Sequence, residues 1–369
     1  MPQLRRRIGA PSAPPTLFLE DGFAMIESAL EKIVAGNDLT RAEAEAVMEQ
    51  ILTGRATNAQ IGGLLIALRD KRETVDELTG FAAVMRRHAT PIVPPGFFAP
   101  HEILVDTCGT GGDVAGTFNI STAAAFVVAG AGVRVAKHGN RSINSRCGSA
   151  DVIEALGGRV DLPASATARA LREIGIAFLF APAVHTATKY AMPARREIRG
   201  RTAFNLLGPL TNPAGASAQV AGVFDPSYTE TLARVLGELG TRRAFVVHGD
   251  DGLDEISLSG ETTVAELRDG EVRTYKLAPE DFGLLRAPLS EIQGGDAREN
   301  AAIIRNILEG QTGPHRAIVE ANAAAALVAA DHAHGFLDGV RQAAESIDSG
   351  AARAKLAALV AFAHEPPVS

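Results

Sequence analysis

The sequence predicts an α/β protein, in which a small all-helical N-terminal domain precedes a larger domain with a mostly parallel central sheet. Three observations predict this class. Helix-capping patterns crowd the first hundred residues, short apolar runs then alternate with helical stretches, and glycine-containing polar loops follow two of those runs. We expect a tail over 1–24, a helical domain over 25–95 that a helix near 186–205 joins, and an α/β domain over 96–369.

Length, composition and charge restrict the class of protein. The 369 residues suffice for two domains, and 46% hydrophobic with 21% charged residues is typical of a soluble globular protein. The net charge of −7 gives no basic field for nucleic acid. Cys108 and Cys147 alone form neither a disulfide framework nor a zinc site, and they suit a reducing compartment. No apolar run is long enough to span a membrane, so we expect a cytoplasmic protein.

The N-terminal residues carry arginines and prolines but no export signal. Arg5–Arg7 are not followed by an apolar segment of about 7–15 residues, which a secretory signal requires. We expect a flexible tail. Met25 is an alternative natural start, because the ordered pattern begins there.

Three capping boxes predict several short helices between residues 25 and 87. In each box a threonine precedes a glutamate or glutamine by three residues, and the pairs are Thr40 with Glu43, Thr57 with Gln60, and Thr74 with Glu77. Gly36 and Gly54 stand where helix C-caps are expected. Apolar residues at helical spacing mark one helix face: Ile61, Leu64, Leu65 and Leu68. This region is interpreted as structural, as a dimer interface, or as both.

Alternating strands and helices are expected after the proline-rich linker at 91–100. The predicted strands cover 102–106, 133–137, 178–180, 218–224 and 243–248, with helices such as 164–174 and 227–239 between them. Asp269-Gly270 predicts a hairpin between 262–268 and 271–277. The C-terminal part is expected to be helical over 299–308, 315–330 and 336–362, and its alanine-rich runs indicate close helix packing.

The main candidate site lies between Val105 and Gly157. Glycines after an apolar run let the backbone turn sharply and approach a ligand, and the polar residues that follow offer donors and possible helix caps. The glycines are Gly109, Gly111 and Gly112, and the polar residues are Asn119, Ser121 and Thr122. A strand, a glycine loop and a helix start together direct N–H groups and a helix dipole at an anion. The spacing fits neither a P-loop nor a dinucleotide-binding fingerprint.

A second polar cluster follows the next apolar run. Lys137, Asn140 and Arg141 surround Gly139 there. Loops at the ends of neighbouring strands converge on one ligand, and Lys and Arg supply positive charge for a phosphate.

Four carboxylates follow the apolar run 245–247, and they are Asp250, Asp251, Asp254 and Glu255. One interpretation is a solvated acidic turn. The other is a Mg²⁺ site, because Mg²⁺ takes one or two carboxylates together with substrate phosphates and water. A metal ion would let this acidic loop lie beside a bound phosphate.

Histidine and arginine residues form a third group of candidates. His138 and His185 are either polar packing residues or part of a ligand site. Arg195, after Pro193, is either on a solvated helix face or a bidentate clamp for a carboxylate. Pro209 has the local pattern of a turn.

Three segments together resemble the anthranilate phosphoribosyltransferase family: Gly109-Thr110-Gly111-Gly112-Asp113, Lys137-His138-Gly139-Asn140-Arg141, and 205–213, which reads NLLGPLTNP. The resemblance runs from about Met25 to the C-terminus. It implies the nucleoside phosphorylase/phosphoribosyltransferase class II-like fold, a homodimer, and transfer of the phosphoribosyl group of 5-phosphoribosyl 1-pyrophosphate (PRPP) to anthranilate in tryptophan biosynthesis. It also implies Mg²⁺, with two ions per subunit.

The resemblance implies roles for individual residues, without a single acid or base. The donor-binding residues it implies are Gly109, Gly111, Gly112, Asp113, Thr117, Asn119, Ser121, Thr122, Lys137 and Ser149. The acceptor-binding residues are Gly109, His138, Asn140, His185, Arg195 and Pro209. The metal-binding residues are Ser121, Asp254 and Glu255. The chain departs from the family pattern around the donor loop and the acceptor channel, at Val114, Gly116, Asn144, Thr186, Thr188 and Arg199-Gly200.

Two other classes of protein share features with this pattern. A nucleoside phosphorylase would need a different glycine-loop signature, and the 208–213 stretch and Arg195 argue against it. A nucleic-acid-binding relative without activity should have a basic face and a degraded acidic pair. The net charge of −7 and the intact Asp254-Glu255 pair argue against that class.

Overall fold

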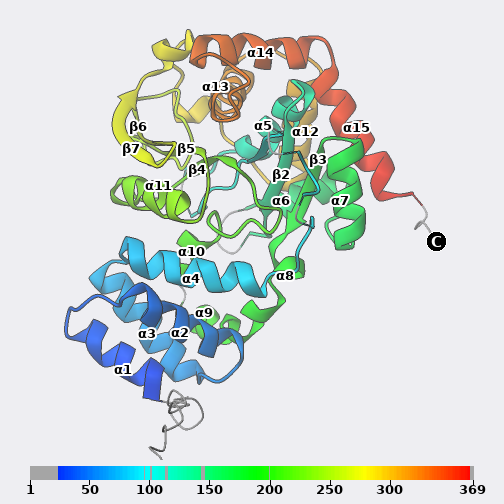
Figure 1. Ribbon diagram of the computed structural model, residues 1–369. Helices are drawn as coiled ribbons and strands as arrows, with labels where there is room; N and C mark the ends of the chain where they lie inside the picture. Colours follow the sequence, from blue (N-terminus) through cyan, green and yellow to red (C-terminus); the bar gives the residue numbers. More distant parts are fainter. Residues whose placement is uncertain are drawn as a thin grey trace, which may run out of the picture.

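A helical part and a sheet-containing part make up the chain (Figure 1). The computed structural model describes residues 24–94, 96–99, 102–112, 115–142, 146–198 and 200–365. Helices cover both faces of a seven-stranded sheet, five strands of which run parallel. The expected fold class is confirmed. In the described part of the chain, no helix is both long and apolar enough to cross a membrane.

The N-terminal helices follow the predicted caps. They are α1 (Ala24–Val34), α2 (Arg41–Leu52), α3 (Asn58–Lys71) and α4 (Val75–His88). All three predicted capping boxes are formed, so each threonine side chain and its partner three residues later satisfy one another's backbone N–H groups. Gly36 and Gly54 have φ of 79° and 73°, the left-handed conformation expected after a helix end.

A later segment of the chain packs against these helices. It comprises η1 (Thr186–Tyr190), α9 (Met192–Ile198) and α10 (Ala203–Leu207). Helix α9 lies against α3, and both lie in the lower part of Figure 1. Ala194 and Phe204 are buried in the same apolar cluster as Leu64 and Leu65.

The sheet has the order β3-β2-β1-β4-β5-β6-β7. Its strands are β1 (Leu104–Asp106), β2 (Arg134–Gly139), β3 (Ile176–Phe180), β4 (Ala218–Gly222), β5 (Arg243–Gly249), β6 (Thr262–Arg268) and β7 (Glu271–Leu277). The predicted hairpin is confirmed: β6 and β7 are antiparallel, and Asp269 and Gly270 between them both have positive φ. The other five strands lie within two residues of their predicted bounds at each end.

Side chains alternate across the sheet, so that each face has its own core. Val105, Val220 and Val247 face a cluster that contains α5 (Ile120–Gly130) and α13 (Pro314–Ala329). Ala221 and Val246 face the cluster that contains α11 (Thr229–Glu238).

The remaining helices are α6 (Ser149–Ala155), α7 (Ala164–Glu173), α8 (Ala181–Val184), α12 (Ala297–Leu308), α14 (Phe336–Asp348) and α15 (Ala351–Ala363), with short 3-10 turns at Pro226–Tyr228, Pro279–Phe282 and Leu289–Glu291.

Two predictions about helix ends need correction. The stretch 336–362 is not one helix but α14 and α15, because Gly350 adopts φ of 77° and ends the helical path between them. Asn119 stands at the N-cap of α5, but its side chain makes no capping bond and is used elsewhere. The predicted close packing of the alanine-rich helices is confirmed, because a Cβ on Gly339 of α14 would lie 2.8 Å from the Cβ of Ala324 in α13.

Candidate active site

The glycine loop follows β1 and is held against the end of β4. The N–H of Thr110 donates to the carbonyl of Gly222 at 2.8 Å, and its Oγ1 accepts from the N–H of Phe224 at 3.1 Å. A Cβ on Gly109 would lie 2.9 Å from that Gly222 carbonyl oxygen, so the close approach requires glycine. Gly111 and Gly112 have φ of 62° and 89°, as the sequence predicts for a sharp turn. Asp113 and Val114, which come next, lie outside the described residues.

The first turn of α5 brings the glycine loop and the acidic loop together. The backbone N–H of Ser121 donates to Glu255 Oε1 at 3.1 Å, across 134 residues of sequence. A carboxylate at a helix N-terminus is stabilised by the helix dipole and by unpaired N–H groups. Next to it, Thr122 is buried, and its Oγ1 has no partner among the described residues. Ser121 and Thr122, predicted donor residues, and Glu255, a predicted metal residue, therefore lie together at this helix end.

Lys137 lies beneath this helix end and not on the surface. Its side chain is buried, and Nζ donates to Thr107 O at 3.0 Å, Thr107 Oγ1 at 3.2 Å and Ser121 Oγ at 3.2 Å. An ammonium group has three hydrogens, and these three bonds use them. In this structure Lys137 thus supplies positive charge below the loop, and its direct contact with a donor stays a prediction.

The acidic loop divides into two pairs. Asp251 accepts from the hydroxyls of Ser257 and Ser259, and Asp250 forms an ion pair with Lys276 at 2.6 Å. These two carboxylates have the structural role of an acidic turn. Glu255 faces Ser121 instead, and the carbonyl oxygen of Asp254 occupies the place where a Cβ on Gly222 would stand. Oxygen atoms of Asp254, Glu255 and Ser121 are the kind of ligand that Mg²⁺ prefers.

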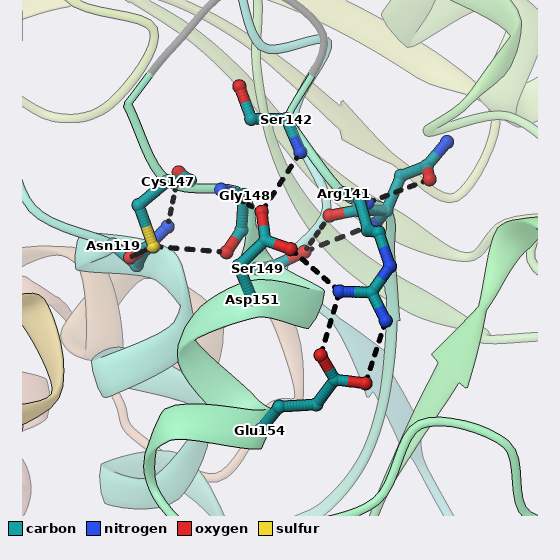
Figure 2. Close-up of polar contacts among 9 residues, drawn as sticks. Asn119, Arg141, Ser142, Cys147, Gly148, Ser149, Asp151 and Glu154 are labelled. Carbon is teal, nitrogen blue, oxygen red and sulfur yellow. Dashed lines mark hydrogen bonds and ion pairs between the residues drawn. The ribbon is translucent and has the colours of Figure 1, made fainter. Parts of the chain in front are cut away.

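Residues of α6 hold together the two ends of the loop that follows β2, as Figure 2 shows for Ser142 and Gly148. One carboxylate oxygen of Asp151 accepts from the N–H groups of Gly148 at 2.9 Å and Ser142 at 3.2 Å. Arg141 donates to the other oxygen of Asp151 and to both oxygens of Glu154, at 2.7–2.8 Å. In this structure Arg141 is paired with two carboxylates, and its contribution of positive charge to a phosphate site stays a prediction.

Asn140 and Ser149, two candidate residues, lie at the same end of β2. The N–H of Asn140 donates to Ser149 Oγ at 3.2 Å, and Asn140 itself is exposed. Both therefore stand at the carboxyl end of β2, beside the glycine loop that follows the neighbouring strand β1. Ligands of open α/β sheets bind outside the carboxyl ends of strands. Asn144 lies outside the described residues.

The histidines form a buried pair. The rings of His138 and His185 have centroids 5.1 Å apart. Burial lowers the pKa of His138 to about 3, to which His185 contributes, and burial lowers the pKa of His185 to about 4. Both rings are neutral at pH 7. His138 Nδ1 lies 3.1 Å from the carbonyl oxygen of Gly208, which can only accept, so Nδ1 carries the proton and Nε2 is an acceptor.

Arg195 and Pro209 occupy different surroundings. The Arg195 guanidinium lies 4.9 Å from the Phe204 ring, and burial lowers the pKa of Arg195 to about 10. No carboxylate in the described part of the chain pairs with it, which leaves its charge for an anionic ligand. The carbonyl of Pro209 accepts from Gln219 at 2.8 Å. Backbone hydrogen bonds connect Arg195 to His185 through Ala191 and Thr188.

Asp106 and Asn212 are site residues that the residue patterns did not single out. Asp106 is fully buried, and burial raises its pKa to about 6. It accepts from the N–H of His138 at 3.1 Å and from Asn212 Nδ2 at 2.7 Å. Asp106, Cys108 and His138 bring ligand-type atoms within 4.8 Å of one another. This mixed O, S and N set differs from the oxygen set that suits Mg²⁺.

Arg201 is a third residue that the patterns did not single out. Its guanidinium donates to the carbonyl of Gly112 and lies 4.3 Å from the ring of Phe224. It thereby connects the segment after α9 to the glycine loop. The one sequence signal for Arg201 is that it stands four residues before the 205–213 motif.

Known proteins match both parts of the chain. Residues 101–353 match the family described as "Glycosyl transferase family, a/b domain", and residues 27–89 match its "helical bundle domain". An anthranilate phosphoribosyltransferase of Moorella thermoacetica is 58% identical over 338 residues, which cover 92% of this chain and 98% of that protein. The enzyme of the same name from Pelotomaculum thermopropionicum is also 58% identical, and the match covers 92% of this chain and 96% of that one.

The chain belongs to the anthranilate phosphoribosyltransferase family.

Solved structures of anthranilate phosphoribosyltransferases share the fold. The Thermus thermophilus enzyme superimposes with a TM-score of 0.85 at 42% identity, covering 91% of this chain and 99% of that one. The Saccharomyces cerevisiae enzyme "in complex with PRPP and Mg" has a TM-score of 0.82 at 26% identity, covering 92% and 98%. Family membership confirms the resemblance and disfavours the phosphorylase and the nucleic-acid-binding alternative.

Proposed function

We propose that this chain transfers the 5-phosphoribosyl group of PRPP to the amine of anthranilate, giving N-(5-phosphoribosyl)anthranilate and pyrophosphate in tryptophan biosynthesis. The observation that carries the proposal is the junction of the glycine loop, the α5 N-terminus and Glu255 around Ser121. An anion-binding helix end beside an acidic pair suits a polyphosphate that is bound together with metal.

The donor would lie along the glycine loop. Backbone N–H groups near Gly111 and Gly112 and the N-terminus of α5 offer partial positive charge, and Lys137 adds a full charge from below. The further donor residues we propose are Gly109, Asp113, Thr117, Asn119, Ser121, Thr122 and Ser149. Fixed dipoles and charges of this kind stabilise the transition state, because they need no reorganisation as charge develops.

Mg²⁺ fits the oxygen donors of Ser121, Asp254 and Glu255, and we propose two ions per subunit. When bound there, Mg²⁺ would neutralise charge on the pyrophosphate leaving group. The chain itself places these three residues. The helix end positions Ser121, and the packing of Asp254 on Gly222 fixes the acidic loop.

The acceptor site needs no strong base. The aromatic amine of anthranilate is neutral at pH 7, and so are His138 and His185. The bond from ribose C1 to pyrophosphate breaks, the bond from nitrogen to C1 forms, and one amine proton is released. We propose that Arg195 binds the anthranilate carboxylate and that Gly109, His138, Asn140, His185 and Pro209 border the ring. Orientation of the two substrates would be their main contribution.

We further propose a cytoplasmic homodimer with a helical domain over 25–95, joined by the segment 186–205, and an α/β domain over 96–369. Among the described residues, four of the six exposed large hydrophobic side chains lie in the helical part, and they are Met25, Val34, Ile66 and Tyr190. The dimer is proposed from family membership, and these side chains are candidates for the subunit interface. Cys108 and Cys147 form no disulfide, which suits a reducing compartment.

The direct test is the loss of anthranilate fluorescence after PRPP is added, with and without Mg²⁺. Loss that needs both donor and metal would support the donor site, the acceptor and the metal together. Unchanged fluorescence with folded protein and Mg²⁺ present would contradict the acceptor assignment. Thr186 and Thr188, which depart from the family pattern, would then be the first positions to examine for a different acceptor.

A further inference from the structure

The side-chain amide of Asn119 is held by two residues at the entrance to α5. Its Oδ1 accepts from Asn300 Nδ2 at 3.0 Å and from the thiol of Cys147 at 3.3 Å, and its Nδ2 donates to the carbonyl of Cys147 at 3.2 Å. Figure 2 shows the contacts between Asn119 and Cys147. Asn300 lies on α12, is 1% exposed, and is 181 residues away along the chain.

Backbone groups at both ends of this arrangement fix the direction of both amides. The N–H of Gly295 can only donate, and it lies 2.7 Å from Asn300, so the atom facing it is Oδ1. Asn300 therefore turns Nδ2 toward Asn119. The carbonyl of Cys147 can only accept, so Asn119 must turn Nδ2 toward Cys147 and Oδ1 toward Asn300.

This orientation leaves one donor of Asn119 for a ligand. An amide nitrogen carries two hydrogens, and Asn119 uses one for Cys147. The second has no acceptor among the described residues, and Asn119 is half-buried at the start of α5, beside Ser121.

We propose that Asn300 is a positioning residue of the donor site, which orients the Asn119 amide so that its free N–H hydrogen bonds to an oxygen of the phosphoribosyl donor. This inference rests on the proposed function. Asn300 acts through Asn119 and does not touch the donor.

Other contacts already join the segment that precedes α12 to the end of the glycine loop. Gln293 Nε2 donates to the carbonyl of Ala115 at 3.0 Å, and the N–H of Gly294 donates to that of Gly116 at 2.9 Å. Thr117 pairs with Gln293 as an isolated β-bridge. The junction therefore has contacts besides the Asn300 side chain. Because Asn300 also lies against the thiol of Cys147, the Asn119→Ala background is needed to assign an effect to the Asn119 amide.

Asn300→Asp tests the proposal with almost no change of shape. The variant keeps the oxygen that accepts from Gly295 but replaces the Nδ2 donor by a second oxygen. When the new carboxyl group is ionised, it would face Asn119 Oδ1, so the amide would turn or withdraw. When the carboxyl group is protonated, it regains an O–H donor. We measure the dissociation constant of PRPP with Mg²⁺ and without anthranilate, as a ratio to wild type from about pH 8 to about pH 5.

The expected ratio is about tenfold at the high end of this range, the size of one lost hydrogen bond, and it falls toward one as the pH is lowered. Asn306→Asp makes the same chemical change on the exposed face of α12 and should give a ratio near one throughout. In an Asn119→Ala background, Asn300→Asp should have no further effect, because the amide it orients is absent.

A ratio that does not vary with pH, or one that persists in the Asn119→Ala background, would overturn the proposal and indicate general repulsion or structural damage. If Asn300→Asp does not fold, Asn300→Ser is measured instead, and a dissociation constant equal to that of wild type would then overturn it. Absence of PRPP binding by the wild type would contradict the proposed function itself, which distinguishes the two failures.

Discussion

His138 and His185 face each other with ring centroids 5.1 Å apart, and both are almost completely buried. Each Nε2 atom lacks a partner among the described residues. The pair therefore offers polar atoms to a ligand while its burial opposes protonation.

Acid should destabilise the protein through this pair. The pKa values of about 3 and about 4 lie below the ordinary 6.5, so the unfolded chain binds these protons first and stability is lost as the pH falls from 6.5 toward 4. The effect of Asp106 on stability has the opposite sign, because its pKa of about 6 in the folded protein exceeds the ordinary 3.8. Below pH 6 the folded protein therefore binds this proton first, and part of the lost stability is regained. From these three groups we expect the free energy of unfolding in urea to fall by about 2.5 kcal/mol between pH 7 and pH 5.

Two variants identify the source of this pH dependence. His185→Gln should reduce the pH-dependent loss by about 2 kcal/mol, the share of one buried histidine over this range. His334→Gln, on the exposed surface, should leave the loss as it is in the wild type. An equal effect of the two variants would show that the buried pair is not responsible.

Arg195→Ala should raise the KM for anthranilate by about 100-fold, because the proposed bidentate bond from Arg195 to the anthranilate carboxylate would be lost. The KM for PRPP should change less than about twofold, since the described contacts of Arg195 are with Met192 and Phe204, outside the glycine loop. Steady-state kinetics with each substrate varied in turn would measure both. Arg196→Ala, the exposed neighbour, is the matched control. A parallel rise of both KM values would refute a specific role in acceptor binding.

Local patterns predicted local structure well. The capping boxes and the Asp269-Gly270 turn depend on residues a few positions apart, so the sequence contains all of their chemistry. The strands that precede the candidate loops were predicted within two residues of their bounds, because their apolar runs are local patterns as well. The partners of the candidate-site residues could not be predicted, because they come from remote segments: Glu255 for Ser121, Glu154 for Arg141, and Asn300 for Asn119. A sequence pattern gives residue type, whereas packing decides whether Lys137 faces solvent or Thr107.

Asp254→Asn and Glu255→Gln should each raise the Mg²⁺ concentration for half-maximal rate by about tenfold or more, because each would remove one negative charge from the proposed metal site. The rate is measured against Mg²⁺ at saturating PRPP and anthranilate. Asp250→Asn is the control, since Asp250 pairs with Lys276 and not with α5. The same shift in all three variants would mean that the loop acts only through its overall charge.

Gly222→Ala should displace the acidic loop, because the new methyl group would clash with the backbone of Asp254. A Cβ on Gly222 would lie 1.5 Å from the carbonyl oxygen of Asp254, and backbone atoms of two segments cannot both stay in place at that distance. We expect a loss of about 2 kcal/mol of stability from overpacking, together with a higher Mg²⁺ requirement because Asp254 and Glu255 are displaced. Urea unfolding and the Mg²⁺ titration measure the two effects.

Gly62→Ala provides the comparison for that variant. Gly62 lies inside α3 with open space where its Cβ would stand, so alanine there should stabilise the protein by up to about 1 kcal/mol and leave the Mg²⁺ requirement unchanged. If Gly222→Ala lost stability but kept the wild-type Mg²⁺ requirement, the strand end would matter for folding alone. A rise in the requirement would show that the contact between β4 and Asp254 sets the position of the metal-binding pair.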